Sequence, residues 1–596
     1  MRCIILHIDD LTEKGERAMP QTAAQTEHLL LALLEQWGDA LTRLQVGLPT
    51  QPELDGGILC PCCKMIHGRC HEAAYPLLTL ARRTGRREYL TAAKKVFRWG
   101  ENMLRPDGSL VNDAKSDWRG TTVFGALALH DALFYHGDLL AASERAAWED
   151  RLARLGGWAY ENLRPGRLQA YLNYYAANAC LMALLGRYFQ NAAYSDLSRE
   201  LAAFCLSHTG ESGLLYGEGR PLDATTDKGC RPVDAGGYNV EETLPLLTRC
   251  AECLGDGDML ARVRERWRAH LIWMLPDGAW DDSAGSRAFK WTYWGSRTAD
   301  GCQEALFALG RQDPVFAEAA LRNAELYARC THNGLLYGGP DYAENGEPPC
   351  VHHTFCHAKT LAGSLNGGLY DFPRVPLPTE TARGVRRLPE LDLLRVTCGG
   401  WIADVTGYDY ARAPGDHAAG GTLSLLWHKR TGPLLACGAA DYQIKEPLNQ
   451  QLPSDPSFHR CACPRMETVI GDVRYAQYYD LQAKLGGRET SDGATVFADA
   501  RLCGRTGDPL PENGALRLQY AFTADSLCIR GETDPAIAAR SLFVLPLIGA
   551  GAAVSVTQGA LSGEPERFFN LNPGFRGFTY SVQPDRNGIF ALVISV

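Results

Sequence analysis

The sequence has no apolar run long enough to span a membrane and no secretory signal at its start. The apolar stretch near the N-terminus covers only Cys3 to Ile8 and is followed at once by Asp9 and Asp10, which is unlike a signal peptide. A basic excess is also lacking, because 69 acidic residues outnumber 60 Lys and Arg residues and give a net charge of -9. We therefore expect a cytoplasmic protein with neither nucleic acid nor a membrane as its partner. An anionic sugar stays open, since a local pocket of Arg, Lys and His can oppose the global charge.

Cysteine is plentiful, with 20 residues in 596, but no disulfide framework is expected without a secretory signal. The run Cys60-Pro61-Cys62-Cys63 is followed by His67 and Cys70, and these side chains could supply the ligands of a structural Zn²⁺. Against zinc, the spacing is tighter than in paired CxxC motifs, and no second CxxC lies nearby. The alternative is a loop that packs at the mouth of a helical ring. We expect that no cofactor is required.

A short loop motif with a central glycine recurs about every 55 residues, and each copy follows a helical stretch. The glycines are Gly108, Gly166, Gly213, Gly278 and Gly334, with steps of 58, 47, 65 and 56 residues. Such self-similarity is typical of stacked supersecondary units, and the period fits two helices and one long loop. The long loops should therefore gather on one face of a ring, where chemistry is expected.

The spacing of apolar residues differs between the two parts of the chain. Residues 21–372 show apolar residues at helical spacing, with joints such as Gly137-Asp138 and Gly255-Asp256. With a first helical pair near residues 22–46 and 68–82, this segment holds about six helical hairpins and predicts an (α/α) toroid. Residues 373–390 are rich in proline and are interpreted as a linker. In residues 391–596 apolar and polar residues alternate with period 2, which predicts an antiparallel β-sheet or β-sandwich domain. Residues 1–20 are expected to be a disordered N-terminus.

Aromatic and polar residues cluster just after the repeated glycines. The candidates are Trp118 and Arg119, then Asn173 and Tyr174, then Tyr238, Asn239 and Glu241, then Trp291, Tyr293 and Arg297, then His352, His353 and His357, joined by His67 and Arg69. Aromatic faces stack on sugar rings, while Arg, Asn and His bind hydroxyls and carboxylates, so the predicted ligand is an acidic oligosaccharide. A single Trp or Tyr at a helix start is more often a core residue, but recurrence in five repeats favours a carbohydrate site. His353 and His357 share a helix face that could suit a metal, although a catalytic or substrate-binding role is favoured because no HExxH motif is present.

A helical toroid followed by an antiparallel β domain resembles the heparinase II/III-like polysaccharide lyases, which include exolytic oligoalginate lyases. Three segments carry the resemblance: Asp234-Ala-Gly-Gly-Tyr238-x-x-Glu241, Gly415-Asp416-His417 with the strands that follow to Gly438, and Ser457-Phe458-His459-Arg460. The family's turn has a second His and an Asp that are missing here, and its Asn-His pair is replaced by Asn173-Tyr174. The resemblance leaves His417 and His459 as zinc candidates without an evident Asp partner.

The resemblance implies β-elimination on a 4-linked uronate glycan such as an alginate or a glycosaminoglycan. Asn173, with Arg119 or a histidine near 352–357, would neutralise the carboxylate charge that develops when C5 loses its proton. Tyr238 would act as general base or acid, and as a base it needs a neighbouring cation to lower its pKa. His353 is the next candidate base, Tyr174 is a further catalytic candidate, and His417 would reach the cleft from the β domain.

Two rival functions stay open. A glycoside hydrolase on the same toroid, similar to an unsaturated glucuronyl hydrolase, would use two of the carboxylates Asp117, Asp234, Glu241, Asp281 and Asp282. A non-catalytic glycan-binding protein would use the same loop face, since helical repeats often bind through one face. Exolytic action on oligosaccharides is expected for an enzyme without a secretion signal. The uronate, its sulfation and a homodimeric state are left open.

Overall fold

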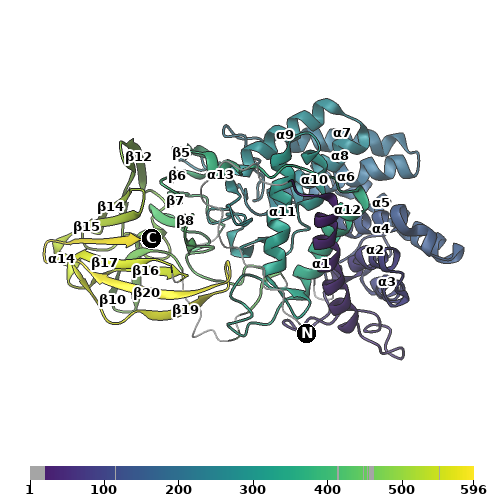
Figure 1. The fold of residues 1–596 in the computed structure, drawn as a ribbon, viewed down its shortest axis with the longest axis horizontal. Helices are drawn as coiled ribbons and strands as arrows, with labels where there is room; N and C mark the ends of the chain where they lie inside the picture. The colour runs from purple at the N-terminus through teal and green to yellow at the C-terminus, as the bar shows by residue number, and fades with distance from the viewer. Residues whose placement is uncertain are drawn as a thin grey trace.

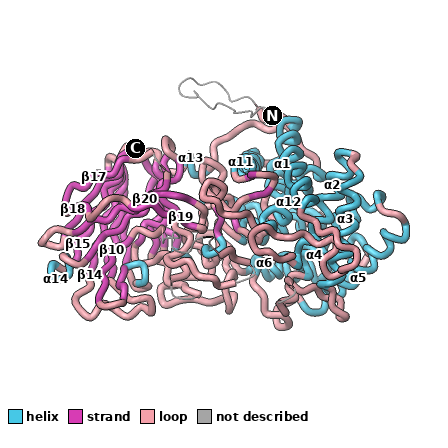
Figure 2. Tube along the Cα trace, turned by 90° about the horizontal axis from the view of Figure 1, so that it is seen from below, coloured by secondary structure: helices cyan, strands magenta, loops and turns pink. Residues whose placement is uncertain are grey.

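The computed structural model describes residues 20–113, 116–412, 415–446, 449–452, 454, 462–549 and 551–596. Helices occupy one half of the molecule and strands the other, in the order that the sequence predicts (Figures 1 and 2). The expected disordered segment 1–20 lies outside the described residues, apart from Pro20. Within the described part of the chain, no helix is long and apolar enough to cross a membrane.

Six helices form a closed inner ring, and each packs against an outer helix. The inner helices are α2 (Ala74–Thr84), α4 (Thr122–His136), α6 (Leu172–Tyr188), α8 (Leu244–Leu254), α10 (Gln303–Gly310) and α12 (Val351–Gly367). The outer helices are α1 (Ala23–Arg43), α3 (Arg87–Trp99), α5 (Ala142–Asn162), α7 (Ala192–Ser207), α9 (Gly257–His270) and α11 (Pro314–Arg329). Every inner helix contacts the next one, and α12 returns to α2. The predicted (α/α) toroid is confirmed.

The ring closes through the two ends of the helical half. The sequence pattern predicted that the first helix pairs with a helix at residues 68–82. In the structure, α1 packs mainly on α12 and makes smaller contacts with α2 and α11. Trp37 of α1 donates its indole N–H to Thr331 over 2.9 Å, and Gln21 pairs with Phe372 in an antiparallel bridge. Sequence periodicity cannot show this pairing, because the partners are about 300 residues apart.

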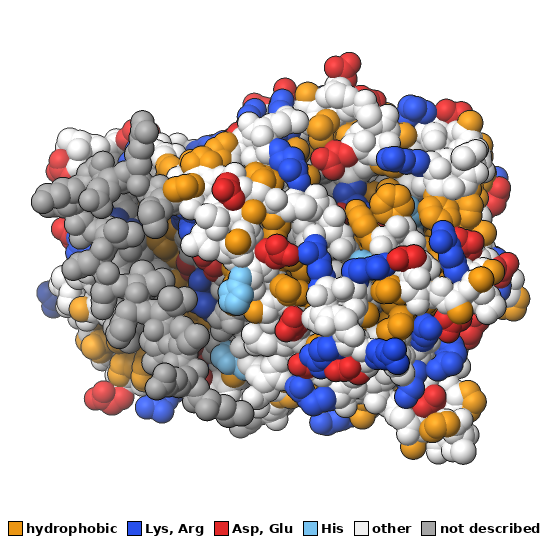
Figure 3. All heavy atoms as spheres, turned by 45° about the vertical axis from the view of Figure 1, so that its right-hand side comes forward, with side chains coloured by type: hydrophobic (Ala, Val, Ile, Leu, Met, Phe, Trp, Pro, Cys, Tyr) orange, Lys and Arg blue, Asp and Glu red, His pale blue; other side chains and the backbone are white. Residues whose placement is uncertain are grey.

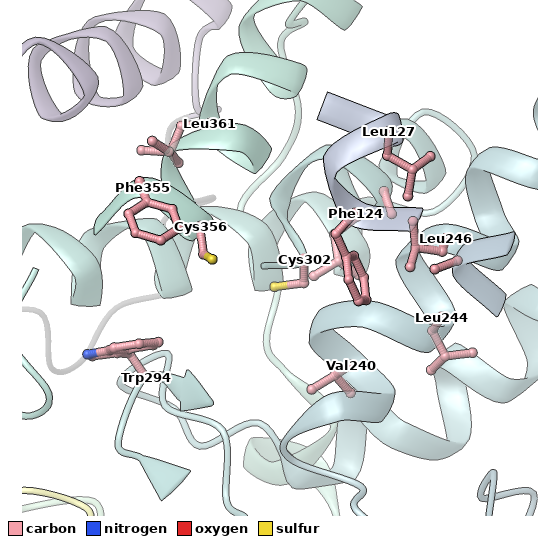
Figure 4. Packing of buried hydrophobic residues seen from close by; sticks show 14 of the residues in the cluster. Phe124, Leu127, Val240, Leu244, Leu246, Trp294, Cys302, Phe355, Cys356 and Leu361 are labelled. Atoms are coloured by element: carbon pink, nitrogen blue, oxygen red, sulfur yellow. The ribbon is translucent and has the colours of Figure 1, made fainter. Parts of the chain in front are cut away.

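Burial explains which helices lie inside. All of Val123 to Leu133 in α4 are buried, as expected for a helix surrounded by neighbours on every side. The outer helix α3 buries only one face, which includes Tyr89 and Val96, and turns its charged residues to solvent. Apolar side chains from α4, α8 and α12 gather in a common core inside the ring (Figure 4). On the face shown in Figure 3, acidic and basic side chains are interspersed.

The repeated glycines adopt one conformation. Their φ angles lie between +80° and +89°, a left-handed region that a side chain rarely tolerates. At Gly278 a Cβ atom would also lie 2.2 Å from the Arg322 carbonyl oxygen. Gly56, at φ +88°, forms a sixth copy after α1, and the sequence analysis missed it. Each copy therefore sits between an outer helix and the inner helix that follows it.

The C-terminal half contains three antiparallel sheets within the described residues. The first has the order β5 (Gly384–Leu388), β6 (Leu393–Cys398), β7 (Trp401–Thr406), β8 (Thr422–His428), β9 (Gly432–Ala436). The second has the order β11 (Val473–Ala476), β10 (Arg465–Ile470), β16 (Ser541–Ile548), β20 (Phe575–Gln583), β18 (Ala560–Leu561), and β19 (Glu566–Asn570) also pairs with β20. The third has the order β12 (Lys484–Thr490), β13 (Gly493–Arg501), β14 (Ala515–Phe522), β15 (Ser526–Thr533), β21 (Ile589–Ser595), β17 (Ala553–Gln558).

The first sheet joins the β half to the toroid (Figure 1). Strand β5 begins at Gly384, inside residues 373–390, which the sequence analysis interpreted as a linker. Arg395 of β6 donates to Asp404 of β7 over 2.8 Å and forms an ion pair with Asp281 of the helical half. Glu390, just before β6, accepts hydrogen bonds from the Ser212 backbone and hydroxyl at 2.7 Å each. Buried polar contacts of this kind fix the two halves in one relative position.

Candidate active site

A cavity of about 250 Å³ opens where the inner helices begin and the β half meets the toroid. Its lining residues are Arg69, Asn112, Ser116, Trp118, Thr121, Phe124, Tyr171, Asn173, Tyr174, Arg220, Tyr238, Glu242, Arg287, Lys290, Thr298, His352, Arg412, Glu446 and Asn449. Five of the segments that lead into an inner helix contribute, and α12 contributes His352 from its own first turn, so the loops gather on one face as the recurring motif predicted. The last three residues come from the β half.

Tyr238 lies immediately before η4 (Asn239–Thr243), a single π-helical turn that opens into α8. The Tyr238 hydroxyl accepts a hydrogen bond from Lys290 Nζ over 3.1 Å and shares another with Thr298. The Arg287 guanidinium lies 3.8 Å from the centre of the Tyr238 ring. Burial raises the pKa of Tyr238 well above its ordinary value of 10, although Arg287 opposes the shift. The phenol therefore keeps its proton in the free protein and is suited to donate it.

Cations and one carboxylate surround the Tyr238 hydroxyl. Glu446 forms ion pairs with Lys290, with Arg287 at 3.3 Å and with Arg412 at 3.0 Å. Burial lowers the pKa of Lys290 to about 8, and Arg287 adds to this shift while Glu446 opposes it. Although burial alone would raise it, Lys290 and Arg287 hold the pKa of Glu446 well below 4.5. The cavity thus has a cationic wall that suits an anionic sugar.

Asn173 and Glu242 form a second polar pair on the cavity wall. Asn173 Nδ2 donates to Glu242 Oε2 over 2.5 Å. Burial raises the pKa of Glu242 to about 8, and nearby Asp300 adds to the shift, so Glu242 is protonated at neutral pH. Within the described residues, Asn173 Oδ1 and Glu242 Oε1 are buried and have no hydrogen-bond partner. Buried polar atoms without partners are uncommon in native proteins and are expected where a ligand completes the bonding.

His352 belongs to the first turn of α12 and lines the same cavity. Both ring nitrogens are buried and have no hydrogen-bond partner in the described part of the chain. Burial lowers the pKa of His352 well below 6.5, and the charges of His67 and Arg69 act in the same direction. The imidazole is therefore neutral at pH 7 and has a free lone pair, as a general base requires.

Aromatic side chains form another part of the wall. Trp118 Nε1 donates to the Tyr174 hydroxyl over 2.8 Å, and the two rings meet edge to face at 5.1 Å. The Arg220 guanidinium lies 5.4 Å from the Trp118 ring. Arg69 also lines the cavity, but its guanidinium is already bound to Glu72. These contacts keep the aromatic groups in fixed positions beside the polar groups.

Several predicted site residues lie in the core instead of the cavity. Asn239 donates to the Leu215 carbonyl, Glu241 accepts from Ser296 and Tyr327, Trp291 donates to the Trp280 carbonyl, Tyr293 donates to Asp277, Arg297 donates to Tyr342, and His417 contacts the Tyr408 carbonyl. For Asn239 and Glu241 the physical reason is helical direction, because Tyr238 and Glu242 share the face toward the cavity and the other two side chains point away from it.

Three further predicted site residues, His353, His357 and Arg119, also lie away from the cavity. His353 and His357 do share a helix face, but this face packs on Trp294, with ring centroids 5.6 and 4.5 Å away, and not on the cavity. Arg119 lies on the surface in an ion pair with Asp107 at 2.5 Å. Among the described residues, His352 is the histidine that lines the cavity.

Four residues that line the cavity were not among the predicted site residues: Glu242, Arg287, Lys290 and Glu446. Glu242 could have been found, because it lies four residues after Tyr238 and therefore on the same helix face. Lys290 precedes the Trp291 candidate directly and was passed over. Glu446 has no sequence signal, because it enters from the β half after β9.

The carboxylates required by the rival hydrolase do not line the cavity. Asp117 is exposed, and Glu241 is held in the core. Asp234 accepts from the backbone N–H groups of Tyr238 and Arg287, at 2.7 and 2.8 Å. Asp281 is paired with Arg395, and Asp282 lies against Asp234. Among the described residues, the carboxylates of the cavity are Glu242 and Glu446.

The predicted zinc ligands divide into two groups. Cys60, Cys63 and His67 lie together with Cys350, which the sequence analysis did not include. Cys62 and Cys70 are not part of this cluster. His459 lies outside the described residues, and His417 is bound to a backbone carbonyl.

Comparison with known proteins gives matches along most of the chain. The sequence model of the ulvan lyase N-terminal domain matches residues 34–371, and that of the ulvan lyase C-terminal domain matches residues 385–558. A broad-specificity ulvan lyase from Formosa agariphila is 36% identical over 543 residues, which cover 89% of this chain and 84% of that protein.

Solved structures share the fold at low sequence identity. A Paenibacillus xanthan lyase has a TM-score of 0.52 and 11% identity, over 96% of this chain and 57% of that chain. The chondroitin AC lyase of Streptomyces coelicolor A3, solved with chondroitin sulphate, has a TM-score of 0.50 and 13% identity, over 98% of this chain and 81% of that chain. The arrangement of a helical toroid and a β half is therefore found in other proteins of known structure.

Proposed function

This chain belongs to the ulvan lyase family, and from that premise we propose that it cleaves a uronate-containing polysaccharide by β-elimination in the cavity around Tyr238. The prediction of a polysaccharide lyase from the sequence is confirmed by this membership. Ulvan is the first substrate to test, because it is the substrate named for the relative from Formosa agariphila.

One observation carries the proposal. Tyr238, His352 and the Asn173–Glu242 pair all line one cavity, and burial favours the neutral form of the phenol, the imidazole and the carboxyl. β-Elimination needs a proton donor, a proton acceptor and groups that stabilise a developing negative charge. It needs neither a metal nor a second ionised carboxylate. The cavity therefore matches elimination better than hydrolysis by two carboxylates.

Asn173 and Glu242 would hold the uronate carboxylate. Because Glu242 Oε2 accepts from Asn173, we place the proton of the carboxylic acid on Oε1, which has no partner in the described residues. A hydrogen bond from Oε1 to the substrate carboxylate would draw charge away from C5 and make the C5 proton more acidic. The Arg287 guanidinium also lines the cavity and adds positive charge there.

His352 would take the C5 proton, and Tyr238 would give its proton to the leaving oxygen. The C5–H bond and the C4–O bond break, a C4–C5 double bond forms, and no water is added. Lys290, which donates to the Tyr238 hydroxyl, would stabilise the phenolate until it recovers a proton. The sequence left Tyr238 as general base or acid, and this assignment takes the acid, because burial raises its pKa.

The direct test is to incubate the protein with ulvan and other uronate polysaccharides and to follow ultraviolet absorbance, with mass spectrometry of the products. We expect a rise in absorbance from the C4–C5 double bond and fragments that have gained no water. Fragments heavier by one water would contradict elimination and support the hydrolase. Exolytic action, also part of the proposal, predicts a single small unsaturated product from the start, whereas a ladder of sizes would overturn it.

A further inference from the structure

Three thiols and one imidazole converge beside the candidate active site. Cys60, Cys63, His67 and Cys350, here called the Cys₃His cluster, place one ligand atom each within 4.8 Å of one another. Cys60, His67 and Cys350 are almost fully buried, and Cys63 is half-buried. The first three residues belong to the loop between α1 and α2, and Cys350 caps the N-terminus of α12. We propose that the Cys₃His cluster binds one structural Zn²⁺.

The spacing of the ligand atoms fits a tetrahedral zinc ion. Cys350 Sγ lies 3.8 Å from the Sγ atoms of both Cys60 and Cys63. Cys350 Sγ also lies 3.5 Å from His67 Nε2. With Zn–S bonds of about 2.3 Å and Zn–N bonds of about 2.0–2.1 Å, tetrahedral geometry requires edges of about 3.8 Å between sulfurs and about 3.6 Å between sulfur and nitrogen. The sulfur separations are too long for a disulfide bond, which needs about 2.05 Å.

The backbone around the first two thiols supports the same assignment. Residues 60–64 make a tight turn in which the Cys63 N–H donates to Cys60 Sγ over 3.3 Å. Lys64 has a φ of +55°, and the flanking Leu59 and Ile66 pair in an antiparallel bridge. The turn therefore places the Cys60 and Cys63 sulfur atoms close together, as two ligands of one ion require.

The donor set selects the metal. Three thiolates with one imidazole in tetrahedral array are typical of structural zinc sites, whereas Mg²⁺ and Ca²⁺ prefer oxygen ligands. Four protein ligands leave no open position for substrate or water, so the ion has a structural and not a catalytic function. Zinc binding would release the protons of the three thiols.

The location of the cluster gives the ion a positioning role. Cys350 is two residues before His352, and the His67 and His352 rings lie 5.2 Å apart. A bound Zn²⁺ would tie the loop after α1 to the first turn of α12, the turn that carries His352 into the cavity. The two ligand groups are about 285 residues apart in sequence, so the ion would also fasten the ring where its first and last inner helices meet. The effect on activity rests on the proposed function, but the metal content does not.

The test measures metal in the full-length chain, expressed with zinc and purified under reducing conditions without chelators. Inductively coupled plasma mass spectrometry should find about one zinc ion per chain in the unaltered protein. Cys350→Ser should lose most of this zinc, while Cys62→Ser, which changes a neighbouring thiol outside the cluster, should retain it. Metal-free protein in all three samples, iron in place of zinc, or equal loss in both variants would overturn the proposal.

A second measurement covers the case in which Cys350→Ser does not fold. Protein produced with Co²⁺ should show the visible absorption bands of a tetrahedral cobalt site and sulfur-to-cobalt charge-transfer bands in the near ultraviolet. Absence of these bands from a folded, cobalt-exposed chain would also overturn the site. If zinc is present but its removal leaves turnover and melting temperature unchanged, the positioning role fails while both the metal site and the lyase proposal stand.

Discussion

Lys290 donates an ammonium N–H to the Tyr238 hydroxyl over 3.1 Å and at the same time forms an ion pair with Glu446 of the β half. The protonation of Tyr238 therefore depends on a row of three interacting side chains, Tyr238, Lys290 and Glu446, that spans both halves of the molecule. Burial lowers the pKa of Lys290 to about 8 and raises the pKa of Tyr238 well above 10. At neutral pH this row consists of a neutral phenol, an ammonium and a carboxylate, which favours proton donation by Tyr238.

Replacing Tyr238 with Phe should remove the proton donor and leave the aromatic ring in place. We expect kcat to fall about 10²–10⁴-fold, the range for loss of a general acid, with little change in substrate affinity. Ultraviolet absorbance of the unsaturated product measures turnover, and calorimetric titration of the inactive variant measures binding. Tyr175→Phe is the matched control, because Tyr175 loses a hydroxyl bonded to the Leu168 carbonyl outside the cavity. Equal losses in the two variants would contradict the assignment.

The pH dependence of turnover should report on Lys290. As pH rises through about 8, Lys290 loses its proton and can no longer stabilise the Tyr238 phenolate, so kcat/KM should fall. Lys290→Arg keeps a positive charge well above this pH, because guanidinium stays protonated. Glu242, with a pKa of about 8, loses its proton in the same range, so the comparison is made between Glu242→Gln and the double variant that also carries Lys290→Arg. Lys290→Arg should move the alkaline fall to higher pH in that comparison, and a fall that stays near pH 8 would contradict its assignment to Lys290.

His352→Ala should remove the base and open space for a substitute. We expect a large loss of kcat that added imidazole partly restores, because a free imidazole can occupy the vacated position. The measurement is turnover against imidazole concentration. His353→Ala is the matched control: His353 packs on Trp294 outside the cavity, so its loss should reduce stability without imidazole rescue. Rescue of neither variant would count against a proton-transfer role for His352.

The fold was largely predictable, because its repeated unit leaves a local signal. Positive φ angles at Gly108 and Gly278 demand glycine, so the turns are visible in the sequence. Gly56 occupies an equivalent turn, but the residues after it are cysteines and not the aromatic residues that marked the other copies. The contact between α1 and α12 left no signal, because pairing between chain ends depends on tertiary packing alone.

The site was predictable only where its residues are local in sequence. Tyr238 and Asn173 were found from their loops, and Glu242 follows Tyr238 at helical spacing. Glu446 and Cys350 were not found, because each meets its partners from a distant segment and has no motif of its own. His353 was preferred to His352 because sequence cannot fix the rotation of α12 to within one residue.

Glu242→Gln should change how stability depends on pH. Glu242 has a pKa of about 8 in the folded chain, above its ordinary value of 4.5, so the folded state holds more protons between these two pH values. The stability it contributes is present below pH 4.5 and is lost as pH rises through 8, at about 1.4 kcal/mol per pKa unit. The variant keeps a neutral group, so its melting temperature relative to the unaltered protein should rise from pH 5 to pH 8.5.

Glu318→Gln should show the opposite dependence of stability on pH. Although burial acts in the other direction, Arg374 and Arg322 lower the pKa of Glu318, whose contribution is therefore present at neutral pH and lost as pH falls. Glu318→Gln should be destabilised at neutral pH, and the difference should shrink toward acid. The same pH trend in both variants would contradict the assignment of a protonated Glu242.

Glu446→Gln should move the alkaline fall of kcat/KM in the direction opposite to Lys290→Arg. Glu446 raises the pKa of Lys290 against the effects of burial and Arg287, so removing its charge should lower that pKa further and shift the fall to more acidic pH. The measurement is the pH profile of kcat/KM for the variant beside that of the unaltered protein. Glu390→Gln is the control from the same half: it removes one of the two oxygens that accept from Ser212 and should lower the melting temperature without moving the profile. If Glu446→Gln lowers the melting temperature and leaves the profile in place, then Glu446 joins the two halves and does not set the charge of Lys290.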